Sequence, residues 1–162
     1  MPVLPVSDLP ASASSPADRE GPKLSNFLCF AVYSANLAFG RAYKPLLDEL
    51  GLTYTQYIAL VALGEEDDQT VGALGEKLFL ESNTLTPILK KLEAGGYIGR
   101  QRDPADERQV RLKLTPAGRD LIAQVPGAAL FEATGLGDEF PVMQQAVATL
   151  RDNLLRAGQS KS

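Results

Sequence analysis

The spacing of apolar residues predicts a mainly helical chain with a helix-turn-helix near its middle. In the segment TLTPILKKLEAGG, Leu85, Leu89 and Leu92 follow the i, i+4, i+7 spacing of one buried helix face. The segment VGALGEKLFL before it is also expected to be helical, with Thr70 as its N-cap. Only the short break ESNT separates the two segments, so the pair predicts a helix-turn-helix.

A different pattern follows the double glycine that ends the second helix. The stretch QVRLKL alternates, with Val110, Leu112 and Leu114 predicted to point inward, and it follows the extended stretch YIGRQR after the turn sequence DPADER. A β-hairpin is therefore expected, and Thr115-Pro116 should open another helix directly after it. A helix-turn-helix followed by a hairpin is the order of a winged helix, and the fold class is mainly α with a small β-hairpin wing (α+β).

Helices are also predicted on both sides of this region. Ser25 is expected to cap a helix over residues 26–41 whose apolar side chains point nearly all the way round, and Pro45 should interrupt or end it. Thr53 or Thr55 should cap a helix that ends at Gly64. A last helix is expected from about Pro141 to Leu155, after a Gly-rich, weakly structured stretch. A helix that is apolar on every side must be buried on every side, and so short a chain offers too few other residues to do this. We therefore expect a homodimer that is joined by the first and last helices.

Length and composition favour one compact domain, since the chain has 162 residues of which 44% are apolar. Within it we expect four regions: a flexible tail, a sensor and dimerisation helix, a winged helix-turn-helix and C-terminal dimerisation helices. Their boundaries are 1–22, 23–50, 51–121 and 122–162.

The residue types exclude several kinds of chemistry. Histidine is absent, which removes Ser/His/Asp and Cys/His nucleophiles, and with them most familiar hydrolase mechanisms, as well as the commonest nitrogen ligand of zinc. We expect no enzyme, no metal site and no cofactor. The single cysteine, Cys29, has no partner in its own chain for a disulfide. The N-terminus lacks the pattern of a secretory signal and no apolar run is long enough to span a membrane, so a cytoplasmic protein is expected.

The distribution of charge changes the expectation set by the net charge of −4, which by itself disfavours nucleic acid as a partner. Basic residues outnumber acidic ones between Thr84 and Pro116, in the second helix of the helix-turn-helix and the hairpin. The predicted winged helix therefore carries a basic surface where DNA would bind.

Two segments of the chain carry a family resemblance. Residues 24–121 resemble the MarR family of winged-helix repressors through LCFAVYSANLAFGRAYKPLLDELGLTYTQYIALVAL and TVGALGEKLFLESNTLTPILKKLEAGGYIGRQRDPADERQVRLKLTPAG. A cysteine in the first helix followed by Tyr33, Tyr43 and Tyr54 is similar to the organic hydroperoxide resistance regulators of that family. Because no second cysteine is present, the chain resembles their one-cysteine type.

The resemblance implies a redox sensor that represses when reduced. Cys29 would be oxidised by an organic hydroperoxide and would then form a mixed disulfide with a low-molecular-weight thiol. Tyr33, Tyr43 and Tyr54 would donate hydrogen bonds to its sulfur, with Tyr43 and Tyr54 acting from the partner subunit. The first turn of a helix, where Cys29 is expected, also favours the thiolate through the helix dipole.

The resemblance also implies a partner, a double-stranded DNA operator with an inverted repeat that the two winged helices of the homodimer bind. The second helix of the helix-turn-helix would enter the major groove, Arg108 at the wing tip would reach the minor groove with Asp106 orienting it, and Arg100, Arg102 and Arg111 would flank it on phosphates. The residues predicted to bind DNA are Ser82, Thr84, Thr86, Lys90, Arg100, Asp106 and Arg108.

Other interpretations of the same residues stay open. A lone cysteine among apolar residues is more often an inert packing group, a lone tyrosine is more often packing than function, and an Asp-x-Arg turn is more often a solvated surface pair. A MarR-type repressor released by a small aromatic ligand, with Cys29 inert, is one alternative function. A thiol peroxidase is another, although it would need no helix-turn-helix.

Overall fold

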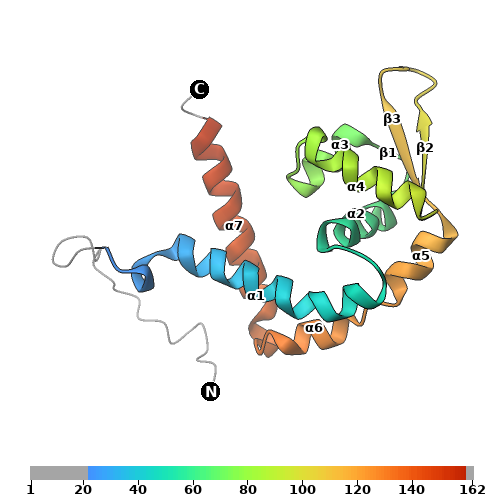
Figure 1. The fold of residues 1–162 in the computed structure, drawn as a ribbon. Coiled ribbons are helices and arrows are strands. Elements are labelled where there is room, and N and C mark those ends of the chain that lie inside the picture. The colour runs from blue at the N-terminus through green and yellow to red at the C-terminus, as the bar shows by residue number, and fades with distance from the viewer. Residues whose placement is uncertain (1–21, 160–162) are drawn as a thin grey trace. The chain divides into compact units, whose positions relative to one another are not determined.

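The computed structural model describes residues 22–159, and the chain forms two compact units. One consists of residues 36–126, and the other combines the chain up to residue 35 with the chain from residue 127 onward. The predicted tail at 1–22 lies outside the described residues except for its last position. In chain order the elements are η3 (Leu24–Asn26), α1 (Leu28–Glu49), α2 (Tyr54–Glu65), β1 (Gln69–Thr70), α3 (Val71–Leu78), α4 (Ser82–Ala94), β2 (Ile98–Arg102), β3 (Val110–Leu114), α5 (Pro116–Ala123), α6 (Gly127–Ala133), η4 (Gly137–Glu139) and α7 (Phe140–Gln159) (Figure 1).

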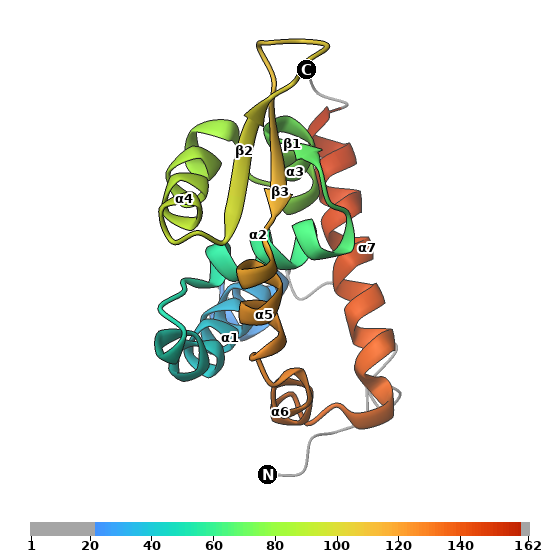
Figure 2. The same ribbon diagram turned by 90° about the vertical axis from the view of Figure 1, so that its right-hand side faces the viewer.

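The unit of residues 36–126 is a winged helix, which confirms the predicted fold class. Strands β2 and β3 pair antiparallel with Arg100 opposite Leu112, and β1 pairs with the other edge of β3, so the sheet order is β1-β3-β2. The loop between β2 and β3 projects beyond α3 and α4 in both views (Figures 1 and 2).

This unit has its own hydrophobic core. Every buried apolar side chain among residues 22–159 lies between Leu47 and Val125. Leu85, Leu89 and Leu92 are at most 1% exposed, as their spacing predicted. The core holds α4 and the hairpin in fixed positions, because a close-packed interior resists displacement of the elements around it.

The ends of the short helices are set by the predicted capping residues. The side chains of Thr53, Thr70 and Thr115 each accept a hydrogen bond from the backbone N–H three residues later, at 3.2, 3.1 and 3.1 Å. Thr53 forms a full capping box with Gln56. Helix α4 begins at Ser82, and Pro87 lies inside it.

Two predictions about the first helix were wrong. Helix α1 begins at Leu28, after a short 3₁₀ helix that contains Ser25, so Ser25 is not its N-cap. It also continues through Pro45 to Glu49. Proline removes one backbone donor, and the helix is supported beyond that point by burial of Leu47 and by the ion pair of Lys44 with Asp48 at 2.8 Å.

Three further elements were not predicted from the sequence, namely α6, η4 and β1. The Gly-rich stretch before the last helix contains α6 and η4, and Phe131 of α6 packs on Phe140 with ring centroids 4.9 Å apart. Strand β1 has only two residues, too few for an alternating pattern. Among residues 22–159 no helix has the length and apolarity needed to cross a membrane.

The other unit leaves its helices largely uncovered. Within residues 22–35 and 127–159 no side chain is buried. Helix α7 exposes Val142, Val147, Leu154 and Leu155 by 45–64%, and a shallow groove runs between Val32 and the C-terminal half of α7. Apolar side chains on α1 and α7 are therefore exposed among the described residues of this unit.

Candidate DNA interface and sensor site

Helix α4 presents the predicted polar face to solvent while its leucines anchor it. Ser82, Thr84 and Lys90 are exposed, and Thr86 is half-buried. The hydroxyl of Thr86 donates to the carbonyl of Ser82 at 2.7 Å, which places the two groups side by side on the first turns. This face offers hydroxyl groups and one ammonium group, which suit phosphates and base edges.

A surface groove of about 660 Å³ lies where α3, α4 and the wing meet. Four of the predicted DNA-binding residues line it, namely Ser82, Thr86, Arg100 and Arg108, whereas Thr84, Lys90 and Asp106 do not. The complete lining consists of residues 70–73, Glu76, Ser82, Thr86, Arg100 and residues 108–110. The fold thus brings residues from α3, α4 and the hairpin to one concave surface.

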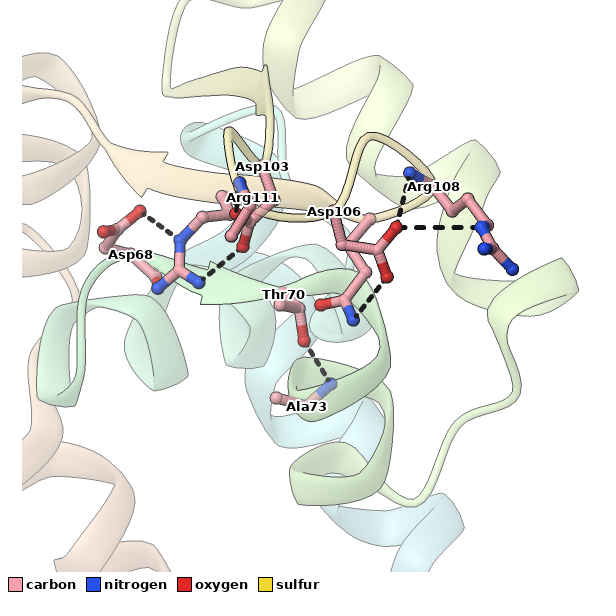
Figure 3. Close-up of polar contacts among 9 residues, drawn as sticks. Asp68, Thr70, Ala73, Asp103, Asp106, Arg108 and Arg111 are labelled. Atoms are coloured by element: carbon pink, nitrogen blue, oxygen red, sulfur yellow. Dashed lines mark hydrogen bonds and ion pairs between the residues drawn. The ribbon is translucent and has the colours of Figure 1, made fainter.

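The wing tip holds Arg108 in solvent. Its side chain is 95% exposed, and its Nε lies 3.8 Å from Asp106 Oδ1. The same oxygen accepts a hydrogen bond from the Arg108 backbone N–H at 3.1 Å, while Asp106 Oδ2 accepts from Gln109 Nε2 at 3.4 Å (Figure 3). Asp106 therefore fixes the loop at Arg108, and its long ion pair leaves the guanidinium group almost fully exposed to solvent.

The wing base is held by Arg111, which was predicted to flank the wing tip on phosphates. Its Nε donates to Asp68 Oδ1 at 3.0 Å, its Nη2 to the Asp68 carbonyl at 2.6 Å and its Nη1 to Asp103 Oδ2 at 3.0 Å (Figure 3). The Ala105 backbone N–H, and after it the Arg111 guanidinium, lower the pKa of the Asp103 carboxyl group. With these donors engaged, the geometry favours a structural role for Arg111 over a phosphate contact.

The loop before α3 supplies further links that the sequence reading missed. Asp67 accepts from the Leu114 backbone N–H at 2.8 Å and pairs with Arg119 at 3.0 Å. The buried Gln69 donates from its side chain to the carbonyls of Ala62 and Glu66. An acidic run such as EEDDQ is usually a solvated turn, and no pattern in it shows that its carboxylates meet strands far along the chain.

Arg100 is less available than the other predicted contacts. Its side chain is 23% exposed, Nη1 lies 3.5 Å from Glu93 Oε2, and Nε is buried with no hydrogen-bond partner among the described residues. Glu93, on the last turn of α4, was not singled out from the sequence.

The predicted sensor cysteine lies on the second residue of α1. Cys29 is an exposed free thiol, and Tyr33 follows one turn later with 59% exposure. The ring of Tyr33 lies 6.4 Å from that of Phe30. The thiol thus has the predicted place in the first turn and an aromatic neighbourhood on its own helix.

The other two sensor tyrosines belong to the unit of residues 36–126, where they meet each other. The rings of Tyr43 and Tyr54 are 5.1 Å apart and edge-on, and Tyr57 joins them at 6.1 Å from Tyr43. Burial, followed by the nearby phenols of Tyr54 and Tyr57, raises the pKa of Tyr43. A phenol with a raised pKa keeps its proton at neutral pH and remains a hydrogen-bond donor. Cys29 and Tyr33 lie in the other unit, so the meeting of all four groups stays a prediction.

The helix-turn-helix, the two-stranded wing and the groove beside them are the features of a winged-helix DNA-binding protein. Comparisons with known proteins identify the family. The model of the family described as "Transcriptional regulator SarA/Rot" matches residues 41–125. The HTH-type transcriptional regulator TtmR of Methylorubrum extorquens (strain PA1) is 44% identical over 155 residues, covering 93% of this chain and 80% of the relative. The organic hydroperoxide resistance transcriptional regulator of Bacillus subtilis (strain 168) is 41% identical over 135 residues, covering 82% and 92%.

A solved structure of reduced AbfR bound to DNA superimposes with a TM-score of 0.72 at 34% identity, covering 83% of this chain and 94% of that one. The chain belongs to the SarA/Rot–MarR type of winged-helix transcriptional regulators. Its similarity to an organic hydroperoxide resistance regulator and its single cysteine agree with the resemblance found in the sequence.

Proposed function

We propose that this protein is a homodimeric transcriptional repressor that releases its operator when an organic hydroperoxide oxidises Cys29. The observation that carries the DNA-binding part is the groove in which Ser82 and Thr86 of α4 and Arg108 of the wing converge. Similarity to an organic hydroperoxide resistance regulator, together with the exposed thiol on α1, supports the sensing part. A DNA partner implies action in the compartment that holds the DNA, which is the cytoplasm in a bacterium.

The dimer follows from the uncovered apolar helices. Side chains on α1 and α7 such as Leu28, Leu154 and Val142 are about three-fifths exposed, which is unusual for a helix face outside an interface. A second copy pairing through these faces would bury them and place two α4 helices for the two halves of an inverted repeat. It would also allow Tyr43 and Tyr54 of one subunit to approach the thiolate of the other.

Oxidation of Cys29 to a sulfenic acid needs no oxidant other than the organic hydroperoxide. The Cys29 thiolate attacks the outer oxygen of the hydroperoxide, a sulfur–oxygen bond forms and the O–O bond breaks. The sulfur loses two electrons and becomes a sulfenic acid, and the leaving alkoxide takes up a proton to give an alcohol. A small thiol can then condense with the sulfenic acid, which yields a mixed disulfide and one water.

Oxidation and release are linked through the dimer. The tyrosine hydrogen bonds that suit a thiolate do not suit a sulfenic acid or a bulkier mixed disulfide, so the surrounding helices rearrange. Because α1 contributes residues to both units, a shift near Cys29 alters the spacing of the two α4 helices in the dimer, and DNA is released.

The test compares the wild-type protein with Cys29→Ser in a titration of operator-bound protein with an organic hydroperoxide. We expect equal operator affinity in reducing buffer and release of the wild type only, because the serine hydroxyl is not oxidised by peroxide. Release of the serine variant by peroxide would refute the sensor assignment. Release of both proteins by an aromatic acid instead would favour a ligand-sensing repressor, and turnover of many peroxide equivalents per chain would favour a peroxidase.

A further inference from the structure

An ion pair beside the groove between α4 and the wing joins Arg100 of β2 to Glu93 of α4, and the proposed DNA contacts do not explain it. Residues 82, 86, 90 and 93 fall within about 80° of one another on a helix that advances about 100° per residue. Glu93 therefore places an exposed carboxylate on the same face of α4 as Ser82 and Lys90. A carboxylate on a surface that meets phosphates costs binding energy unless a cation neutralises it.

Arg100 is the cation that lies beside Glu93. Its Nη1 is 3.5 Å from Glu93 Oε2, longer than the roughly 2.7–2.9 Å of a good charge-assisted hydrogen bond. The guanidinium Nε has no partner among the described residues. An arginine has five N–H donors in a planar fork, so this pair leaves most of its capacity unused.

The same arginine lines the groove, whereas Glu93 does not. A DNA phosphate offers two oxygens to an arginine fork, which forms two parallel hydrogen bonds and is stronger than one long contact. When a phosphodiester enters the groove, Arg100 has two rival anions, one on its own chain and one on DNA.

We infer that Glu93 competes with a DNA phosphate for Arg100, so that this carboxylate sets the affinity of the repressor for DNA. The inference rests on the proposed DNA-binding function. In the free protein Arg100 pairs with Glu93, and in the complex its guanidinium turns to the phosphate while Glu93 remains in solvent. Because the contact is with the backbone of DNA, it changes affinity for operator and for unrelated duplexes alike.

The competition predicts how a neutral side chain at position 93 will act. Glu93→Gln should tighten operator binding by about two- to thirtyfold per dimer, the range expected when two partly exposed ion pairs no longer compete. The slope of log K against log salt should stay nearly the same, because Arg100 neutralises one phosphate per chain in the wild-type complex and in the complex of the variant.

Two controls separate this effect from a simple change in net charge. Glu76→Gln removes the same charge from a residue that lines the same groove but has no ion pair with Arg100 in the described part of the chain. Arg100→Met keeps the apolar stem and removes the guanidinium. In that background Glu93→Gln should lose its advantage over Glu76→Gln, and thermal unfolding of each variant checks that it folds.

The experiment is fluorescence anisotropy of labelled operator and of an unrelated duplex over a series of salt concentrations. A larger gain for Glu93→Gln than for Glu76→Gln, lost in the Arg100→Met background, supports competition. Equal gains, or gains unchanged without Arg100, would overturn it, and weaker binding of Glu93→Gln would show that Glu93 orients Arg100. If the wild type itself fails to bind any operator duplex, the proposed function fails instead.

Discussion

Replacement of Arg108 by alanine should separate the wing's part in DNA binding from its part in folding. The side chain is 95% exposed, and its ion pair with Asp106 spans 3.8 Å. Surface substitutions without buried partners change the free energy of unfolding by no more than about 0.5 kcal/mol. Arg108→Ala should therefore fold like the wild type and retain the peroxide reactivity of Cys29.

The loss of affinity follows from the symmetry of the proposed dimer. A specific groove contact by arginine contributes about 1–3 kcal/mol, and a homodimer loses two of them, or about 2–6 kcal/mol in total. Since 1.4 kcal/mol is about tenfold, the dissociation constant of the operator complex should rise by roughly 30-fold to 20,000-fold.

The assay is operator binding at one fixed moderate salt concentration, with Arg102→Ala as the matched variant. Arg102 is exposed on β2, so its replacement removes the same charge from the same hairpin. Arg108→Ala should lose far more affinity for operator than Arg102→Ala does, and the two should be similar on unrelated DNA. Unchanged operator binding by Arg108→Ala would refute the proposed contact and would leave the wing with a structural role only.

Three further results are expected. Tyr43→Phe and Tyr54→Phe should each slow oxidation of Cys29 by removing a hydrogen bond to its thiolate. If the alkylation rate of the thiol depends on pH in the same way in both mutants and the wild type, the two tyrosines have a packing role only. Gly118→Ala should lower the free energy of unfolding by about 1–3 kcal/mol in urea, because a Cβ there would lie 2.3 Å from the Tyr97 carbonyl oxygen. Since the folded state raises the pKa of Tyr43 above 10.0, stability should fall as pH rises past that value, and less steeply in Tyr43→Phe.

Much of the winged helix was predictable because its signals are local. The leucine spacing of α4 and the caps at Thr70 and Thr115 depend on neighbours in the chain, and the structure confirms each of them. Pro45 misled the reading of α1, because the cost of one lost backbone bond is offset by tertiary burial of Leu47 that no local pattern reports.

The candidate site divides in the same way. Spacing alone placed Ser82 and Thr86 on one polar face of α4, whereas the role of Arg111 depends on Asp68, a residue 43 positions away. In the sequence Arg108 and Arg111 are two arginines of one basic hairpin. Only the fold shows that Arg111 holds the base of the wing through hydrogen bonds while Arg108 extends into solvent. Glu93 and Arg100 likewise become a pair only when β2 lies against α4.

The central claim, that the redox state of one sulfur controls DNA binding, is tested most directly by following both quantities in one sample. Reduced protein on operator is treated with an organic hydroperoxide and a low-molecular-weight thiol, and aliquots are taken for intact mass spectrometry and for operator binding. We predict one mixed disulfide per chain, at Cys29, with the fraction of modified chains matching the fraction of released DNA, and a reductant that reverses both. Mostly disulfide-linked dimers, or full and reversible release from chains that carry no adduct, would contradict the account.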